Sequence, residues 1–385
     1  MKILHSTNDW LSLTKKWLYD QVRYSNNEFK HDVWCDEIIG EWNVSNNTGI
    51  YQEKISSVVR LKKKVFNKAF PTVLQSLKSN VVDFGEYDVI VSHFGTRAWH
   101  DLPYVSKKTN LKKVVRFYGY DLNVGKCSDV WRKRYAQIFK KYDIIVSMGP
   151  AMTRQLIDIG APKGKVIESA LGIDQEDMLE IKTNIKSCVD PLKIIIIGSF
   201  VQKKGIPLAI EGIADFVKQT KKDVQLTIVG DVNKSDRGSL LEGRKIQSAA
   251  MRANFPVEFT GYLNYQDLIK EIDKNLIVLT PSITADDGDN EGGYNLTTVL
   301  AASRGLINLS SNHCDGGLLL IDRQSGIVFE ENSATEISDA LNYIVELSCE
   351  ELEGYSKKSL SFMRSNFVAS DLQSQLLDNI QVSNA

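Results

Sequence analysis

Cysteine is scarce in this sequence, and its few cysteines form no recognisable pattern. Five occur among 385 residues, and no two have the C-x-x-C spacing. An odd number of scattered cysteines argues against a disulfide framework and against a zinc site. We therefore expect a protein of the reducing cytoplasm with no bound metal. The five are Cys35, Cys127, Cys188, Cys314 and Cys349.

Long apolar runs are missing as well. No uninterrupted apolar stretch approaches the roughly 18 residues that a bilayer-spanning helix needs. The opening residues MKILHSTNDWLSL also lack the apolar centre of a signal peptide. We therefore expect any membrane association to be peripheral.

The length and the charge distribution indicate two domains. A chain of 385 residues is too long for one ordinary hydrophobic core. The net charge of −1 conceals an asymmetry, because residues 1–185 carry 28 Lys and Arg against 21 Asp and Glu, whereas residues 186–385 carry 19 against 27. Halves of about +7 and −8 favour domains with different partners, although solvated faces alone would give the same totals.

Short apolar runs rich in β-branched residues recur in both halves, separated by amphipathic segments. Runs of this length that end in Gly or Ser are typical of buried parallel strands in βαβ units. The sequence therefore predicts an α/β protein with two doubly wound domains. The runs cover residues 2–6, 87–95, 112–119, 142–149 and 165–172, then 192–200, 224–231, 257–263, 276–282 and 305–311.

Two further segments are predicted from local pattern. The polar stretch 180–192 contains Asp190-Pro191 and is expected to be the interdomain linker. The stretch WLSLTKKWLYDQVRYS, which starts at Trp10, is expected to form an amphipathic helix. Parallel sheets bind ligands beyond the carboxyl ends of their strands, so the loops there are the candidate sites.

The loop after residue 197 has features of a phosphate site. Gly198 and Gly205 flank a loop that ends in Lys204 and leads into a helical pattern. A glycine loop that opens a helix offers unpaired backbone N–H groups, and a nearby ammonium adds positive charge. The alternative is a plain strand-to-helix turn with a solvated lysine, since the spacing matches neither G-x-G-x-x-G nor the P-loop.

The stretch TADDGDNEGGYNLTTVLAASRGL, residues 284–306, has an acidic loop before an apolar run. A calcium loop is rejected, because Thr298 occupies the twelfth position, where a bidentate Glu is needed. Glu291 remains, followed by Gly292 and Gly293 at the start of a predicted helix. A carboxylate that accepts sugar hydroxyls beside amides that hold a diphosphate would suit a nucleotide sugar.

Taken in order, these segments resemble family 4 glycosyltransferases of the GT-B fold, most closely bacterial exopolysaccharide enzymes of the colanic acid and amylovoran type. The resemblance covers about residues 87 to 345 and rests on the order and spacing of VSHFG, RFYGYDLN, GSFVQKKG, LTIVGD, VEFTGYL and LTPSITADDGDNEGGYN. It implies two Rossmann-like domains facing each other across a cleft. It also implies retaining, metal-independent sugar transfer from a nucleotide sugar, UDP- or GDP-linked, without another cofactor.

The resemblance assigns roles to individual residues. Glu291 would contact the donor sugar, Lys204 would neutralise the diphosphate, and Tyr118 and His93 would line the opposite wall. The predicted donor-binding set is Gly198, Ser199, Lys204, Asp231, Glu291, Gly292, Gly293, Tyr294 and Asn295. Because charge develops on the departing phosphate, preorganised donors would be the main catalytic contribution.

Several of these residues have a plain structural alternative. His93 fits a satisfied structural histidine as well as a site residue, and His100 is the weaker candidate of the two. Asp121 could orient an acceptor hydroxyl or cap a helix, with capping favoured. Asp231 could contact the nucleotide or simply form a local turn.

Three positions depart from the family pattern. Ser199 stands where the family has an arginine, and Tyr118 replaces the histidine of its FHG motif. The second glutamate of the E-x7-E pair, which holds ribose, would fall at Val299 or Leu300. These losses leave a catalytically impaired sugar-nucleotide binder or partner subunit as an alternative. A sugar-nucleotide epimerase is the remoter one.

The resemblance also sets the expected domains and partners. Residues 1–185 would bind a saccharide or lipid-linked acceptor, residues 186–360 the nucleotide sugar, and a helix at about 361–385 would return to the first domain. The stretch from Lys54 to Val82 has seven basic residues and no acidic one, so Lys54 to Lys78 could contact an anionic membrane. The alternative is a helix with solvated lysines, and nucleic acid is not expected.

Overall fold

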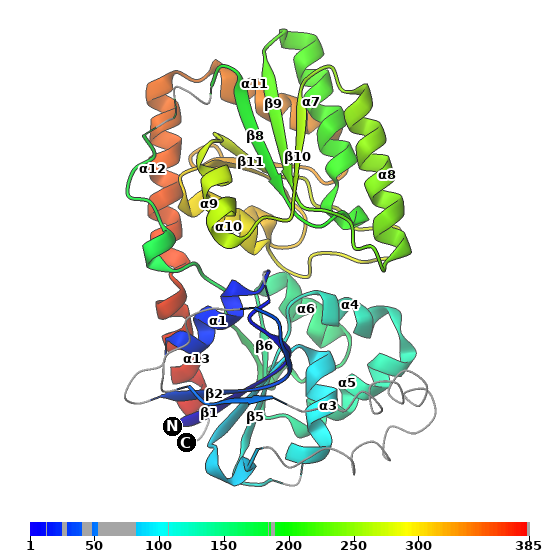
Figure 1. Cartoon of the computed structure of the whole chain (residues 1–385), viewed down its shortest axis with the longest axis vertical. Helices are drawn as coiled ribbons and strands as arrows, with labels where there is room; N and C mark the ends of the chain where they lie inside the picture. The colour runs from blue at the N-terminus through cyan, green and yellow to red at the C-terminus, as the bar shows by residue number, and fades with distance from the viewer. Residues whose placement is uncertain are drawn as a thin grey trace. The chain divides into compact units, whose positions relative to one another are not determined.

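The computed structural model describes residues 1–12, 14–24, 29–40, 48–52, 82–106, 108–183, 185 and 189–382. The predicted membrane-facing stretch from Lys54 to Lys78 lies outside the described residues. The chain divides into two compact units (Figure 1). Unit 1 comprises Met1–Met148, Thr153–Ser169 and Leu376–Ala385, and unit 2 comprises Gly149–Met152 and Ala170–Gln375. The division thus falls at Ser169/Ala170, whereas the sequence favoured a linker over residues 180–192.

Unit 1 contains a seven-stranded sheet with the order β3-β2-β1-β4-β5-β6-β7, in which every strand pair is parallel. The strands are β1 (Lys2–Trp10), β2 (Lys30–Ile38), β3 (Ile50–Gln52), β4 (Val89–His93), β5 (Lys112–Arg116), β6 (Ile144–Ser147) and β7 (Val166–Glu168). The helices are α1 (Lys16–Arg23), α3 (Gly95–Val105), α4 (Tyr120–Cys127), α5 (Asp129–Lys141) and most of α6 (Pro150–Asp158). The helix predicted from Trp10 begins only at Lys16, because β1 continues through the buried Trp10.

The end of the chain packs on the sheet of unit 1. Leu376, Leu377 and Ile380 of α13 (Ala369–Val382) lie in one core cluster with residues of β1, β4, β5 and β6. The Lys112 ammonium also donates to the Ile380 carbonyl at 2.6 Å. Residues far apart in the sequence therefore share one hydrophobic core.

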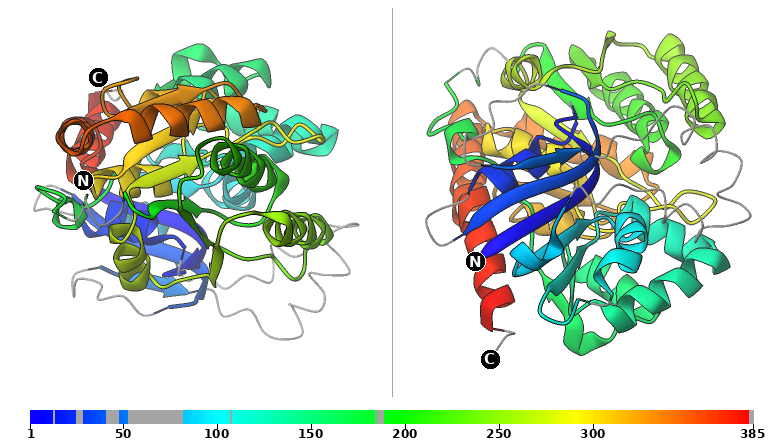
Figure 2. Two further views of the ribbon diagram at one scale, coloured as in Figure 1. Left: turned by 90° about the horizontal axis from the view of Figure 1, so that it is seen from above. Right: turned by 60° about the horizontal axis from the view of Figure 1, so that its bottom comes forward.

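Unit 2 contains a six-stranded parallel sheet with the order β10-β9-β8-β11-β12-β13. Figure 2 shows the ribbon from two further sides, with the strands of this unit in green to orange. The strands are β8 (Leu192–Ile197), β9 (Val224–Val229), β10 (Val257–Gly261), β11 (Ile277–Thr280), β12 (Ile307–Ser311) and β13 (Gly326–Phe329). The helices are α7 (Ile206–Thr220), α8 (Arg237–Arg252), α9 (Tyr265–Asp273), α10 (Leu296–Ser303), α11 (Ala334–Glu346) and α12 (Cys349–Asn366). Both units are Rossmann-like, which confirms the predicted fold class.

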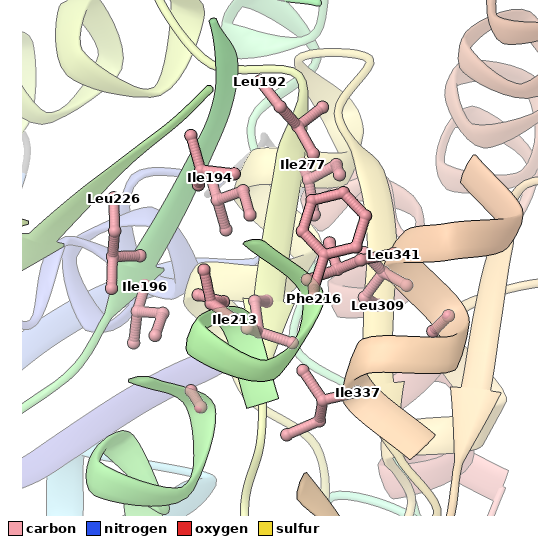
Figure 3. Packing of buried hydrophobic residues seen from close by; sticks show 14 of the residues in the cluster. Leu192, Ile194, Ile196, Ile213, Phe216, Leu226, Ile277, Leu309, Ile337 and Leu341 are labelled. Atoms are coloured by element: carbon pink, nitrogen blue, oxygen red, sulfur yellow. The ribbon is translucent and has the colours of Figure 1, made fainter. Parts of the chain in front are cut away.

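The core of unit 2 joins this sheet to α7 and α11. Ile213 and Phe216 of α7 are fully buried, and Figure 3 shows them among strand residues and Ile337 and Leu341 of α11. Gly212 permits this approach, because a Cβ there would lie 2.7 Å from the Ala334 carbonyl oxygen. Each large side chain buried in this way contributes roughly 1.5 to 3 kcal/mol. This packing fixes the strands whose carboxyl ends carry the candidate site.

Candidate functional site

The loop between β8 and α7 places Lys204 at the start of a helix. A short 3-10 turn, Gln202–Lys204, ends at Gly205, which has φ +60. A Cβ at Gly205 would lie 1.9 Å from the Pro281 carbonyl oxygen, so only glycine fits this backbone. The loop is therefore locked against the strand end that precedes the acidic loop.

Lys204 and Glu291 form an ion pair. The Lys204 Nζ lies 2.9 Å from Glu291 Oε1, and the two side chains are only 17% and 9% exposed. The same ammonium donates to Asn295 Oδ1 at 2.5 Å. Ser282 completes the group, because its hydroxyl donates to Glu291 Oε1 at 3.1 Å and accepts from Asn295 Nδ2 at 3.1 Å. Unit 2 thus brings together the two residues that the sequence singled out separately.

The carboxylate of Glu291 is held in its charged form. Burial raises the pKa of Glu291, but the positive charges of Lys204 and Lys203 and the hydrogen bond from Lys204 lower it more. The net pKa lies below the usual value for glutamate. At neutral pH Glu291 is therefore an anionic acceptor, suited to hydroxyl donors and unsuited to giving up a proton.

Lys203 holds the acidic loop in place. Its ammonium donates to Asp289 Oδ1 at 3.1 Å and to the Asn290 carbonyl at 3.0 Å. The neighbouring Gln202 accepts from the Asp286 amide at 3.2 Å. Two consecutive lysines thus have different roles, because one braces the loop and the other meets Glu291.

The turn after Glu291 differs in part from expectation. Gly292 and Gly293 are buried, and the Gly292 amide donates to Asn290 Oδ1 at 2.8 Å. In this structure the loop itself uses the N–H, and the predicted contact of this amide with a ligand stays a prediction. Asn295, at the N-cap of α10, makes no side-chain cap because its amide group is held by Lys204 and Ser282.

Tyr294 supports the site from behind. Its hydroxyl donates to the Leu171 carbonyl at 2.9 Å and accepts from the Leu171 amide at 2.5 Å. Its ring packs edge-on against Phe367. The tyrosine is only 8% exposed, so its side chain anchors the turn and does not face a ligand.

His313 is a site residue that the sequence reasoning missed. Its Nε2 accepts from the Glu291 amide at 3.2 Å, and its Nδ1 lies 2.9 Å from Glu331 Oε2. A bare Nε2 requires the hydrogen on Nδ1, which donates to Glu331. Glu331 also accepts from the Thr284 amide, so one carboxylate orients both ends of the acidic loop. The available signal was position, because His313 follows β12, a strand that the sequence predicted.

The remaining predicted residues of unit 2 have structural contacts. Asp231 accepts from the Val232 amide at 2.7 Å, a contact within its own loop. The Ser199 hydroxyl accepts from the Tyr262 hydroxyl at 3.3 Å. Gly198 lies under the Lys204 stem, since a Cβ there would be 3.1 Å from Lys204 Cδ.

Val299 and Leu300, the positions expected to lack the second carboxylate, are 0% and 3% exposed and belong to the hydrophobic side of α10. Neither side chain can contact a ribose by hydrogen bonding.

In unit 1 a chain of hydrogen bonds crosses four neighbouring strands. His93 Nδ1 lies 2.6 Å from the Tyr118 hydroxyl, and His93 Nε2 lies 2.8 Å from His5 Nδ1. His5 Nε2 in turn lies 2.7 Å from His31 Nδ1. The sheet register explains this line, because Ile3 pairs with His31, His5 with Val91, and His93 with Arg116. Each step along the line advances two residues, which keeps all four side chains on one face of the sheet.

The three imidazoles are buried. His93 is 0% exposed, and His5 and His31 are each 1% exposed. Burial lowers the pKa of all three, to about 4 for His31, and for His5 the charges on His31 and His93 lower it further. Each N···N contact needs one hydrogen and one bare nitrogen, so the tautomers of the three rings are set together. The three histidines are therefore neutral at physiological pH.

His93 does not line a wall, contrary to the prediction. Its ring is fully buried, and the hydrogen bond to the partly exposed Tyr118 is its link to the surface. Burial raises the pKa of Tyr118 above its usual value, so the phenol stays protonated. Trp17 packs on the Tyr118 ring at 4.4 Å between centroids. His100 is exposed on α3 and does not belong to the line of hydrogen-bonded side chains from Tyr118 to His31.

Asp121 is a structural residue. Its carboxylate is completely buried and accepts from the Gly95 amide at 2.7 Å and the Tyr118 amide at 3.0 Å. Burial raises its pKa to about 6, against the lowering effect of these backbone hydrogen bonds. Asp121 thus caps the start of α3 and holds the loop that presents Tyr118.

The described residues contain no group of three or more His, Cys, Asp or Glu side chains arranged to hold a metal ion. Across the same part of the chain, no helix is both long and apolar enough to cross a membrane.

Comparison with known proteins identifies the second unit. The family model for glycosyl transferases group 1 matches residues 177–359, which include Lys204, Glu291 and His313. This part of the chain is therefore similar to glycosyl transferases group 1.

Named relatives are distant. The chain is 22% identical over 316 residues to a putative colanic acid biosynthesis glycosyltransferase, WcaL, of Escherichia coli K12, covering 80% of this chain and 74% of that protein. It is 27% identical over 258 residues to the amylovoran biosynthesis glycosyltransferase AmsK of Erwinia amylovora, covering 66% of this chain and 60% of that protein.

Solved structures share the fold over the whole length. Sucrose-phosphate synthase of Thermosynechococcus elongatus has a TM-score of 0.78 at 13% identity, covering 99% of this chain and 98% of that one. The Anabaena protein HepE, solved with UDP and glucose, has a TM-score of 0.73 at 13% identity, covering 99% and 100%. The two Rossmann-like units therefore have the GT-B fold, as predicted.

Proposed function

We propose that the chain is a retaining glycosyltransferase that moves a sugar from a nucleotide sugar to a saccharide or lipid-linked saccharide in bacterial surface polysaccharide synthesis. The observation that carries the proposal is the buried pair of Lys204 and Glu291 beside the start of α10. A cation for phosphate and a carboxylate for hydroxyl groups stand there within one hydrogen-bonded group. The names of the colanic acid and amylovoran relatives support the acceptor class.

The charged pair suits a sugar diphosphate. The Lys204 ammonium would turn to the diphosphate, and the first backbone amides of α10 would add their partial positive charge. Glu291, released from the lysine, would accept hydroxyl hydrogens of the donor sugar. HepE, solved with UDP and with UDP-glucose, favours a UDP-sugar as the first donor to test.

The chemistry needs little beyond this positioning. The bond between the sugar C1 and the diphosphate oxygen breaks, and the acceptor oxygen forms a new bond to C1 on the same face. The acceptor proton passes to the departing phosphate, whose charge Lys204 and the helix amides stabilise. We assign the acceptor to unit 1, where the protonated phenol of Tyr118 offers a neutral hydrogen-bonding group, and we place the enzyme in the cytoplasm.

A catalytically impaired sugar-nucleotide binder is the second candidate. It is favoured by Val299 and Leu300, whose buried apolar side chains leave no carboxylate for ribose. Losing a charged hydrogen bond costs roughly 1.5 to 3 kcal/mol, or about one to two orders of magnitude in affinity.

One experiment separates these functions. The protein is incubated with a panel of UDP- and GDP-sugars, and both thermal stabilisation and nucleotide release are followed. Stabilisation by a donor with nucleotide release in the presence of a saccharide acceptor would support the transferase. Stabilisation without turnover would support the binder, and a folded protein that responds to no donor would contradict both.

A further inference from the structure

Helix α8 has one buried face and one exposed face of unusual composition. Residues 239, 242, 243 and 246 are buried and pack α8 onto unit 2. In Figure 1, α8 lies beside α7 at the right-hand edge of this unit. The exposed residues recur at intervals of three and four, so they share one side of the helix. They include Arg237, Leu240, Leu241, Arg244, Lys245, Ser248, Met251 and Arg252.

This exposed face, called the α8 face below, alternates cations with apolar side chains. Leu240, Leu241 and Met251 are 38%, 47% and 86% exposed. Four cations lie between and beside them, and the single acid of α8, Glu242, is buried and pairs with Lys245 at 3.1 Å. The nearest exposed acid, Asp236, is held at the N-cap by the Gly238 amide.

The other helices of unit 2 lack this combination. No large hydrophobic side chain of α7, α11 or α12 is exposed. Their solvent faces mix acids with lysines, as ordinary solvated faces do; Glu211, Asp215 and Lys218 on α7 are examples. The basic α8 face also stands on a half of the sequence whose charge is about −8, from 19 basic and 27 acidic residues. Solubility does not account for such a face.

We propose that the α8 face docks on an anionic lipid bilayer. A helix with cations beside apolar side chains lies in the plane of a membrane, with its apolar groups among the acyl chains and its cations at the headgroups. The long stems of Arg and Lys reach the headgroup level from such a position. Charge complementarity thus favours anionic lipid, and burial of the apolar side chains among the acyl chains adds to the binding free energy.

Nucleic acid fits the α8 face less well. Single strands are bound through aromatic stacking as well as charge, and α8 carries no aromatic residue. Phosphate contacts alone would leave Leu241 and Met251 in water. The docking surface is independent of the proposed transferase activity, because none of its residues belongs to the group around Lys204 and Glu291.

The test uses the full chain and sedimentation with two kinds of vesicle, phosphatidylcholine alone and phosphatidylcholine with phosphatidylglycerol. The charge variant replaces Arg237, Arg244 and Arg252 by Gln, and the apolar variant is Leu241→Gln with Met251→Gln. The matched control replaces the three exposed lysines 218, 221 and 222 at the end of α7 by Gln, which removes the same charge from the same unit. Thermal unfolding shows whether each variant remains folded.

The wild-type chain should bind the anionic vesicles and not the neutral ones, and binding should weaken as salt rises. Each cation near the surface contributes roughly fivefold, so the charge variant should bind at least about tenfold more weakly, with the control within about twofold. The apolar variant should also lose binding. No binding by the wild type, an equal loss in the control, or unchanged binding in folded α8 variants would each overturn the proposal. Stronger binding to a single-stranded oligonucleotide than to vesicles would do the same.

Discussion

The carboxyl edges of the two sheets both bury polar side chains, but the partners of these side chains differ between the units. In unit 2 the edge carries full charges, with Lys204 paired to Glu291 and Lys203 to Asp289. In unit 1 the edge carries a line of neutral rings, from Tyr118 through three histidines. A charged pair can be opened by a ligand that offers opposite charges, whereas a neutral line can only exchange hydrogen bonds. The contrast teaches that one fold, used twice, gives a charged edge in unit 2 and a neutral, hydrogen-bonded edge in unit 1.

Removing the cation of unit 2 should have the largest effect. Lys204→Met leaves the buried Glu291 charge without its partner, which costs roughly 3 to 5 kcal/mol of unfolding free energy. Donor affinity should fall about a hundredfold, as measured by calorimetry with the donor found in the panel. Lys218→Met, an exposed lysine on α7, is the control and should change neither quantity.

The pair itself is tested by adding Glu291→Gln to Lys204→Met. The second change removes the unpaired charge, so the double variant should regain part of the stability in urea unfolding. A double variant that is less stable than Lys204→Met would contradict the assignment of an ion pair.

Acid should lower the unfolding free energy of unit 1 through the neutral line of Tyr118, His93, His5 and His31. The pKa of His31 is about 4 in the folded chain and 6.5 without burial, so the unfolded chain binds more protons between these values. Stability is therefore full above pH 6.5 and falls as the pH drops toward 4. His31 alone accounts for about 3 kcal/mol of this loss.

His31→Gln is the variant that isolates this effect. It should reduce the proton uptake on unfolding by nearly one, measured as the slope of unfolding free energy against pH between 6.5 and 4. His100→Gln, an exposed histidine, should leave the slope unchanged. Equal slopes for His31→Gln and the wild type would show that the buried line does not titrate as described.

Neutralising the acid of unit 2 should have a smaller effect than removing its cation. Glu291→Gln keeps an amide oxygen for the hydrogen bonds from Ser282 and Lys204, so the fold should persist. Sugar hydroxyls lose a charged acceptor, worth roughly 1.5 to 3 kcal/mol, and kcat/KM should drop about 10- to 100-fold. Asp287→Asn, at an exposed position of the same loop, should retain wild-type kinetics. Similar losses in both variants would point to loop charge in general.

The smallest effect is expected at the end of the neutral line. Tyr118→Phe removes one hydroxyl, worth roughly 0.5 to 1.5 kcal/mol, so the acceptor KM should rise by up to about tenfold. The donor KM should not change, because Tyr118 belongs to unit 1. Steady-state kinetics with each substrate varied in turn would separate the two, and a change confined to the donor would reverse the assignment of the units.

Most strands that the sequence predicted are buried apolar runs, such as β8 and β9. β2 was missed, because its residues KHDVWCDEI hide polar groups that have partners: Asp32 is 6% exposed and accepts from the Gly49 amide and the Tyr87 hydroxyl. A pattern of hydrophobicity cannot reveal a buried carboxylate that is satisfied from distant loops. The short strands β3 and β13 were missed as well.

The candidate site divides in the same way. Lys204 and Glu291 were found because each lies in a loop between a predicted strand and a predicted helix. The connection of His93 to His5 and His31 depends on strand order and register, which a single sequence does not contain. The engagement of the Gly292 amide by Asn290 was likewise invisible, because it depends on the conformation of a loop.

Lys204 and Glu291 satisfy each other in the free protein, so the donor of the proposed function must supply a new partner to each of them. An inorganic anion would pair with the lysine and leave the glutamate without a partner. A free sugar would pair with the glutamate and leave the lysine without one. Only a molecule that joins a phosphate to a polyhydroxyl ring compensates both halves at once. The ion pair of the free protein would then discriminate against phosphate alone and against free sugar.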